Sequence, residues 1–189
     1  MVTKQGLIED LRELGCIRYQ PDNPFTLASG KVSPWYFDIK RACCSSLLEV
    51  PIVELLMDEL PYDYCKCIGG VANAGYFLVG GICSQYCVSE FTGFVLRKQP
   101  KDHGIEGAID GIPPKEGSHV TLVEDVITTG GSLVKAIKYV EEVVVGTVDR
   151  ILTVVDRNEG DHPEFAPYRS IVKSIITREE IQQEAIKWR

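Results

Sequence analysis

The sequence lacks any long apolar run, and no stretch of its 189 residues approaches the roughly 20 apolar residues of a membrane-spanning helix. It also lacks an apolar segment behind its first residues, "MVTKQGLIED", so no secretory signal is predicted and we expect a soluble protein that stays in the cytoplasm. Internal repeats and low-complexity segments are absent as well. These absences favour one globular domain over residues 1–189.

Positive charge is scarce. Lys and Arg number 20 against 27 Asp and Glu, which gives a net charge of −7. Nucleic-acid partners bind through basic surfaces, so the balance argues against them. It does not exclude anionic small molecules, because their binding depends on local charge.

Cysteine is present in an odd number, seven, so the cysteines cannot all pair within one chain. We interpret them as reduced, small core residues, because most lie in apolar or periodic segments. A metal site is the alternative, formed by the thiolates of Cys65, Cys67, Cys83 and Cys87. Neither pair has the C-x2-C spacing of a zinc knuckle, and we expect no metal bound by the protein alone.

The first 60 residues predict two helices. Leu7, Ile8, Leu11 and Leu14 form one apolar face of a helix that ends near Gly15. The stretch "FTLASGKVSPWYFDIK" predicts two short extended pieces around a Ser-Gly turn. A second helix is expected over residues 51–60, with its proline in the first turn.

From residue 64 onward, expected strands and helices alternate. Such alternation predicts an α/β fold whose mainly parallel central sheet carries helices on both faces. The expected strands cover residues 64–68, 94–97, 120–124 and 150–156, the expected helices residues 75–87 and 132–145, and a strand and a helix close the chain. Residues 98–118 show no periodicity and are rich in glycine, proline and charge, which indicates a mobile surface loop.

The stretch "VTLVEDVITTGGSLVKAI", residues 120–137, carries the clearest chemical pattern. A strand is followed by Glu124 and Asp125, and then by threonines, glycines and a serine at the start of a helix. Free backbone N–H groups at a helix N-terminus favour an anion, and glycines let the backbone approach it closely. The two carboxylates suit the diol of a ribose whose 5′-phosphate lies in the loop. The alternative is a polar turn with a serine cap.

These residues resemble the motif of the type I phosphoribosyltransferases, which bind 5-phosphoribosyl-1-pyrophosphate (PRPP). Three further stretches are similar to the orotate phosphoribosyltransferases within that family: "FTLASGKVSPWYFDIK", "RKQPKDHG" and "DRNEG". The resemblance implies the type I phosphoribosyltransferase fold, with a small N-terminal hood (residues 1–45) and a mobile lid (residues 98–118). It also implies Mg²⁺-dependent transfer of phosphoribose from PRPP to orotate, giving orotidine 5′-phosphate and pyrophosphate in pyrimidine synthesis.

The resemblance implies a PRPP site shared between the lid and the loop after the acids. Val126, Ile127 and Ala74 belong to this site through the backbone, and the catalytic residues would be Arg97, Lys101, His103 and Asp125. The complete set comprises Ala74, Arg97, Lys98, Lys101, His103, Glu124, Asp125, Val126, Ile127, Thr128, Thr129, Gly130, Gly131 and Ser132. Mg²⁺ would be held mainly by the substrate, with Glu124 and Asp125 nearby.

The basic stretch "RKQPKDHG" has a physical reason of its own. Negative charge grows on the departing pyrophosphate, and cations delivered by a closing loop stabilise it. A solvated basic loop is the alternative. The resemblance implies that Arg97, Lys101 and His103 act in the neighbouring subunit while Lys98 acts in its own, so a homodimer is expected.

Orotate recognition is assigned by the resemblance to Thr128, Arg157, Tyr36 and Phe37. The guanidinium of Arg157 follows a strand end and can bind a carboxylate through two hydrogen bonds. A surface arginine paired with Asp156 or Glu159 is the alternative, and the aromatic residues could equally be core residues.

The sequence also departs from its family. Ala74 and Ala28 stand where some members carry lysine, and Tyr76-Phe77 replaces a common Ile-Pro, so "IGGVANAG" supplies no cation to the pyrophosphate. Two alternatives of function remain: a PRPP-binding regulator of the same fold, and a phosphoribosyltransferase for another base.

Overall fold

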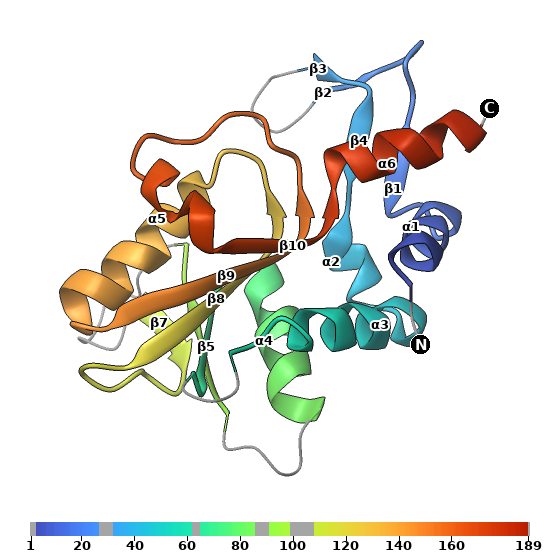
Figure 1. Ribbon diagram of the computed structural model, residues 1–189. Coiled ribbons are helices and arrows are strands. Elements are labelled where there is room, and N and C mark those ends of the chain that lie inside the picture. Colours follow the sequence, from blue (N-terminus) through green and yellow to red (C-terminus); the bar gives the residue numbers. More distant parts are fainter. Residues whose placement is uncertain (1–2, 27–31, 62–64, 86–90, 99–107, 189) are drawn as a thin grey trace.

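The computed structural model describes residues 3–26, 32–61, 65–85, 91–98 and 108–188. Its centre is a six-stranded sheet in the order β10-β9-β8-β5-β6-β7 (Figure 1). The strands are β5 (Cys67–Val71), β6 (Thr92–Leu96), β7 (Ile109–Gly111), β8 (His119–Ile127), β9 (Thr147–Asp156) and β10 (Val172–Thr177). All neighbouring strands pair in parallel except β7, which runs antiparallel to β6 at the edge. The predicted α/β fold with a mainly parallel sheet is confirmed.

The N-terminal part forms two small antiparallel sheets beside the central one. In the first, β1 (Ile17–Tyr19) pairs with β4 (Trp35–Phe37); in the second, β2 (Phe25–Thr26) pairs with β3 (Val32–Ser33). Two capped helices bracket these strands, namely α1 (Lys4–Glu13) and α2 (Ile39–Ala42). The Thr3 hydroxyl accepts the Gly6 N–H, and the Asp38 carboxylate accepts the Arg41 N–H, so each helix starts at a side-chain cap.

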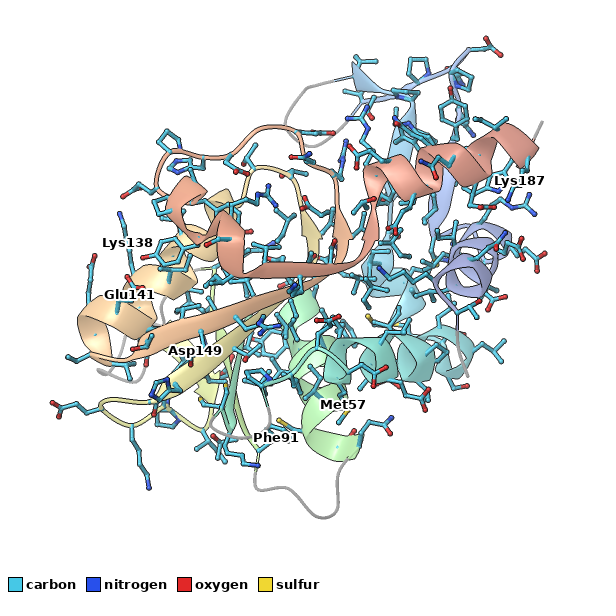
Figure 2. The ribbon with its side chains drawn as sticks, in the orientation of Figure 1. Met57, Phe91, Lys138, Glu141, Asp149 and Lys187 are labelled. Atoms are coloured by element: carbon cyan, nitrogen blue, oxygen red, sulfur yellow. The ribbon has the colours of Figure 1, made fainter. Side chains whose placement is uncertain are left out.

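Helices cover both faces of the central sheet. On one face, α1, α3 (Ser46–Met57), α4 (Ala74–Gln85) and α6 (Arg178–Ala185) bury a core that includes Leu7 and Ile181. Met57, at the end of α3, belongs to the same core (Figure 2). On the other face, α5 (Gly131–Lys138) packs Leu133 against Phe165 and the sheet. A π-helical turn (Tyr139–Val143) continues α5, and 3-10 turns cover Ala166–Ile171 and Ile186–Trp188. Burial on both faces explains why β5 and the middle parts of β8 and β9 are largely apolar.

Several predicted boundaries were wrong. The helix expected over residues 51–60 begins five residues earlier, at Ser46, and contains Pro51. Leu48 is fully buried, and its packing explains why the helix includes the residues before Pro51. The strand expected over 64–68 covers Cys67–Val71, where Gly69 and Gly70 lie against neighbouring backbone and side chains. The predicted surface loop contains β7, whose three residues gave no periodic signal.

Other elements were found in shifted form. The strand expected at 94–97 is β6, which starts two residues earlier, at Thr92. The strands expected at 120–124 and 150–156 lie within the longer strands β8 and β9. The expected helix 132–145 stops being α-helical at Lys138, and helix 75–87 corresponds to α4, with Cys87 outside the described residues. Leu14 is 37% exposed because α1 ends at Glu13, one residue before it.

The cysteines are mostly internal. Cys16, Cys43, Cys65 and Cys67 are buried, and burial raises the pKa of the Cys43 thiol to about 12 and that of Cys67 to about 11. Cys44 is exposed, which corrects its assignment to the core. Within the described ranges, no group of three or more His, Cys, Asp or Glu side chains could hold a metal ion. In the same part of the chain, none of the helices has the length and apolar character needed to cross a membrane.

Candidate functional site

The turn between β8 and α5 is an open cradle of backbone. Residues 128–130 leave the strand, and Gly130 caps α5 in the left-handed conformation, with φ of 77°. A Cβ atom at this position would lie 2.2 Å from the ring of Phe165, which packs beneath the turn. Gly130 is therefore required both for its backbone angle and for the close approach of a ring. The Leu133 N–H donates to the Gly130 carbonyl at 3.0 Å, so the N–H groups of Gly131 and Ser132, at the start of α5, are the ones placed for an anion.

A second segment supports this cradle from the side of β9. The Arg157 N–H donates to the Ile127 carbonyl at 2.8 Å, and the His162 N–H donates to the Thr129 carbonyl, also at 2.8 Å. The Glu159 N–H reaches the Thr128 carbonyl at 3.4 Å. These bonds support the turn from outside.

Glu124 lies almost completely inside the protein, with 6% of its surface exposed. Its Oε2 accepts a hydrogen bond from the Ser132 hydroxyl at 2.9 Å, which ties the strand to the first turn of α5. Burial raises the pKa of this carboxyl well above its ordinary range, and the neighbouring Asp125 charge raises it further. Glu124 is thus a buried group whose oxygens are oriented by the Ser132 hydroxyl.

Asp125 has a different partner from its neighbour. Its Oδ2 lies 3.6 Å from the Nζ of Lys40, which comes from α2 in the N-terminal part. The side chain of Asp125 is 15% exposed and that of Lys40 is 52% exposed. Adjacent positions of one strand therefore connect to two separate helices, α5 and α2.

A cavity of about 470 Å³ lies above the carboxyl ends of β5, β6 and β8. This edge of a parallel sheet is where ligands bind in open α/β folds. Among the predicted PRPP residues, the cavity is lined by Ala74, Arg97, Lys98, Glu124, Asp125, Val126, Gly131 and Ser132. Ile127, Thr128, Thr129 and Gly130 lie between Val126 and Gly131 in the chain without lining the cavity, and the Ile127 side chain is buried.

Arg97 comes at the end of β6 and is held by a carboxylate. Its Nη2 donates to Asp110 Oδ1, on β7, while the Tyr76 hydroxyl donates to Asp110 Oδ2 at 2.5 Å. The hydrogen bond that Asp110 accepts raises the pKa of the Tyr76 hydroxyl. The Nε of Arg97 is buried without a hydrogen-bond partner among the described residues. Arg97 and Lys98 thus line the cavity of their own chain, with Arg97 fixed at one edge of its guanidinium.

Arg157 is buried rather than superficial, with 7% of its surface exposed. Its Nη2 pairs with Glu159 Oε1 at 2.5 Å, and its guanidinium lies 5.3 Å from the centre of the Phe37 ring. Its Nε has no partner within the described part of the chain. The sequence alternative of pairing with Glu159 is therefore found, but in a buried setting that joins β4 to the end of β9.

The ring of Tyr36 lies near Arg18 and Phe25, whereas the ring of Phe37 lies near Arg157. The guanidinium of Arg18 lies 4.6 Å from its ring centre, and the Phe25 ring centre lies 5.4 Å away. Trp35 and Phe37 stack on each other instead, as expected for alternate residues of a strand. Of the predicted orotate residues, the structure therefore brings together the side chains of Arg157 and Phe37. Lys101, His103 and Ala28 lie outside the described residues.

Sequence reasoning missed three charged residues at this site. Lys40 and Lys135 line the cavity, and Asp110 holds Arg97. Lys135 could have been found, because it lies one turn after the glycines of the predicted loop. No sequence signal indicated Lys40 or Asp110, since each meets its partner only through the fold.

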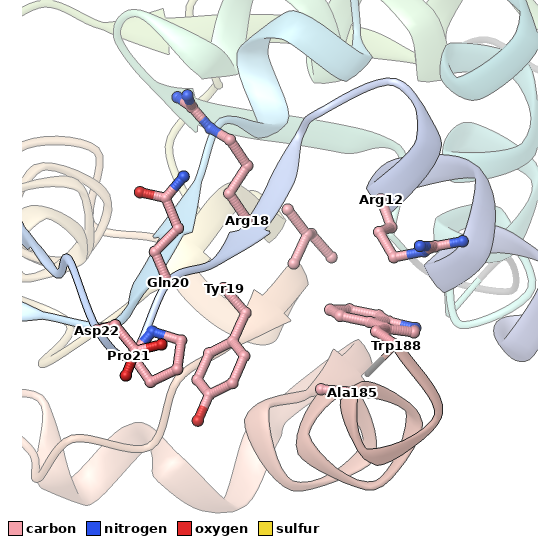
Figure 3. A pocket seen from close by; sticks show the side chains of 9 residues that line it. Arg12, Arg18, Tyr19, Gln20, Pro21, Asp22, Ala185 and Trp188 are labelled. Atoms are coloured by element: carbon pink, nitrogen blue, oxygen red, sulfur yellow. The ribbon is translucent and has the colours of Figure 1, made fainter.

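A second cavity, of about 740 Å³, opens between β1 and the C-terminal helix (Figure 3). Its wall includes the rings of Tyr19 and Trp188 and the guanidinium of Arg12, which lies 5.5 Å from the centre of the Trp188 ring. Although it is larger, it contains neither the acids nor the glycine turn. We therefore place the chemistry in the smaller cavity.

Comparisons with known proteins identify the family of this chain. The model of the phosphoribosyl transferase domain matches residues 68–187. The orotate phosphoribosyltransferase of Methanocaldococcus jannaschii is 35% identical over 182 residues, covering 96% of this chain and 98% of that protein.

Solved structures agree. The orotate phosphoribosyltransferase of Aeropyrum pernix aligns with a TM-score of 0.79 at 26% identity, covering 97% of this chain and 99% of that one. The Mycobacterium tuberculosis enzyme of the same name, in complex with PRPP, aligns with a TM-score of 0.72 at 27% identity, covering 95% and 98% of the two chains.

Proposed function

This chain belongs to the orotate phosphoribosyltransferases, and we propose that it transfers phosphoribose from PRPP to N1 of orotate in a Mg²⁺-dependent reaction. The products are orotidine 5′-phosphate and pyrophosphate, in the synthesis of UMP. One observation carries the proposal: the acids, the glycine turn and the buried Arg157 meet at one edge of one sheet.

The ribose 5-phosphate part of PRPP binds at the start of α5. Backbone N–H groups of residues 126–132 and the hydroxyls of Thr128, Thr129 and Ser132 hold the phosphate. Glu124 and Asp125 accept hydrogen bonds from the ribose hydroxyls. The support of the turn by residues 157–162 makes this half of the site preorganised.

The pyrophosphate part of PRPP lies over β5, at the loop before Ala74, where the backbone binds it. Arg97 and Lys98 line the same cavity from the end of β6. Lys101 and His103 belong to the lid. We propose that the enzyme is a homodimer in which Lys101 and His103 serve the partner subunit's site, while Arg97 and Lys98, which line the cavity of their own chain, serve their own site.

Orotate binds between the hood and the phosphate turn. Arg157 offers its unpartnered Nε edge to the orotate carboxylate, while Glu159 holds its Nη2 edge. Phe37 packs on the guanidinium, and Thr128 and the backbone of Tyr36 complete the base site. A planar anion is thereby preferred to a neutral base.

The residues stabilise charge and need no protein nucleophile. As the bond from C1′ to pyrophosphate breaks, the positive charge at C1′ is offset by nearby carboxylate oxygens, with Asp125 nearest to the cavity. The cations at the other end of the cavity stabilise the departing pyrophosphate. Orotate N1 is held in line for attack, and this positioning supplies much of the rate.

The donor set also fits Mg²⁺, which prefers one or two carboxylates together with substrate phosphates. Glu124 and Asp125 supply carboxylate oxygens beside the ribose, but each already has a protein partner. PRPP oxygens would therefore hold most of the metal. When bound, Mg²⁺ neutralises the pyrophosphate. We propose that the reaction takes place in the cytoplasm.

A turnover assay with a panel of bases tests the proposal. Purified protein is mixed with PRPP, Mg²⁺ and either orotate, uracil, adenine or hypoxanthine, and the absorbance of each base is followed. We expect loss of orotate only. Turnover of another base would identify a different transferase, and PRPP binding without any turnover would identify a regulator.

Hybrid dimers test the shared site. Lys101→Ala and Arg157→Ala chains, each expected to have little activity alone at an orotate concentration far below the KM of Arg157→Ala, are mixed and allowed to exchange subunits. Because one site of each hybrid then carries neither change, activity should return. Hybrids that form but remain inactive would show that the lid serves its own chain.

A further inference from the structure

The cavity has an electrostatic problem that the predicted residues do not solve. Glu124 and Asp125 lie side by side on β8, at the place where a highly charged anion must bind. The described loop before Ala74 carries no cation to offset them. Some other positive group has to lie next to the acids if the pyrophosphate end of PRPP is to approach.

Among the described residues that line the cavity, the cations are Lys40, Arg97, Lys98 and Lys135. Lys135 lies on α5, at the end that receives the 5′-phosphate. Arg97 and Lys98 follow β6, on the side of β5 away from β8, and Asp110 already holds Arg97. Lys40 alone of these four approaches from the side of the acids, at 3.6 Å from Asp125.

The fold anchors the helix that carries Lys40 but leaves the ammonium group of Lys40 partly free to bind a ligand. Ile39 and Ala42 are completely buried, and Asp38 caps the helix, so α2 is firmly anchored beside its lysine. This helix lies against both α4 and β8, the two elements that border the pyrophosphate end. With its side chain 52% exposed, Lys40 keeps donors free beyond those facing Asp125, because an ammonium group carries three.

We infer that Lys40 is a further PRPP-binding residue, whose ammonium group contacts the pyrophosphate of PRPP from the side opposite Arg97 and Lys98. The inference rests on the proposed function and deepens it. In the free enzyme Lys40 offsets the charge of Asp125. In the complex it binds both Asp125 and the pyrophosphate, and it supplies the positive charge that Ala74 cannot.

Calorimetric titrations with inorganic pyrophosphate and with ribose 5-phosphate, both in Mg²⁺ buffer, test this inference. Lys40→Gln should weaken pyrophosphate binding about fivefold to tenfold, the loss expected for one charge-assisted hydrogen bond in a half-exposed setting. Ribose 5-phosphate binding should change less than about twofold, because that ligand lacks the group that Lys40 contacts. Lys40→Arg should restore most of the pyrophosphate affinity.

Lys4→Gln is a matched control. Lys4 also pairs with a carboxylate, Glu180, at 3.8 Å, and its side chain is 53% exposed, but it does not line the cavity. Lys4→Gln should bind pyrophosphate and ribose 5-phosphate with the same affinities as the unmodified protein. Unchanged pyrophosphate affinity in Lys40→Gln, or an equal loss of both ligands, would overturn the inference.

A double variant separates contact with the ligand from an effect through Asp125. In an Asp125→Asn background, Lys40→Gln should still weaken pyrophosphate binding, because the contact is direct. If the effect disappears there, Lys40 serves only to hold Asp125. Failure of the proposed function itself would look different, since the unmodified protein would then not turn over orotate and PRPP, whatever Lys40→Gln does to pyrophosphate binding.

Discussion

The two ends of the active cavity are built in different ways. The proposed 5′-phosphate end is a single stretch, residues 124–132, whose turn is supported by Phe165 and by hydrogen bonds from residues 157–162. The proposed pyrophosphate end is assembled from separate elements: Lys40 on α2, the loop before α4, and Arg97 and Lys98 after β6. One end is fixed by backbone geometry, and the other by ion pairs between side chains.

This difference has a chemical reason. The 5′-phosphate keeps its charge and its place during the reaction, so a rigid cradle is sufficient. Pyrophosphate changes charge and leaves, which requires cations that can adjust as it departs. Substitutions should therefore have large, local effects at the first end and smaller, coupled effects at the second.

The largest effect is expected from Gly130→Ala, which breaks the rigid end. Its Cβ would meet the Phe165 ring in a backbone conformation with φ of 77°, so the free energy of unfolding should fall by about 3 kcal/mol. Binding of ribose 5-phosphate should weaken about a hundredfold, a factor that corresponds to about 2.7 kcal/mol. Denaturant unfolding and calorimetry measure both.

Gly117→Ala is the control for backbone strain alone. Gly117 has φ of 74°, yet nothing lies within 4 Å of a Cβ built there. The free energy of unfolding of Gly117→Ala should fall by only about 1 kcal/mol, and its affinity for ribose 5-phosphate should stay unchanged. Equal losses in the two variants would mean that the fit against Phe165 is unimportant.

Base recognition should be separable from both ends. Arg157→Gln should raise the KM for orotate about thirtyfold, since about 2 kcal/mol is typical of a hydrogen bond to a charged group, while PRPP binding stays unchanged. Arg178→Gln, which also removes an arginine near Glu159, should leave the orotate KM as it was. Steady-state kinetics with varied orotate decide the point, and an equal change in PRPP binding would contradict it.

The pyrophosphate end should respond moderately to loss of the group that orients Arg97. Asp110→Asn keeps an acceptor for the Tyr76 hydroxyl but removes the charge facing Arg97, so the PRPP KM should rise about fivefold. Tyr76→Phe should change it only about twofold. In an Arg97→Gln background, Asp110→Asn should no longer raise the PRPP KM. If the effects of the two substitutions on the PRPP KM are fully additive, Asp110 does not act through Arg97.

The last prediction concerns pH. The raised pKa of Glu124 means that this carboxyl stabilises the fold when protonated, and that the contribution is lost as pH rises above the ordinary value of 4.5 toward the raised one. Relative to Glu124→Gln, the unmodified protein should therefore lose stability over that interval, by up to about 1.4 kcal/mol for each pH unit. Thermal unfolding against pH measures it, and parallel curves for the two proteins would refute it.

The same division explains what could be predicted from the sequence. The 5′-phosphate end is contiguous, so acids, threonines and glycines at fixed spacing revealed it, as did the alternation of strands and helices for the sheet. Lys40 and Asp110 lie far along the chain from the residues they contact, and no local pattern marks them. Strand β7 was missed because its pairing with β6, and not its residue types, makes it a strand.

The central claim, that one cavity holds both ends of the reaction, is tested most directly by running the reaction backward. Orotidine 5′-phosphate and pyrophosphate are mixed with the protein and Mg²⁺, and the appearance of orotate and PRPP is measured by absorbance and phosphorus NMR. The account predicts that orotate and PRPP form in equal amounts, and only when both substrates are present. Binding of both substrates without formation of orotate would contradict it.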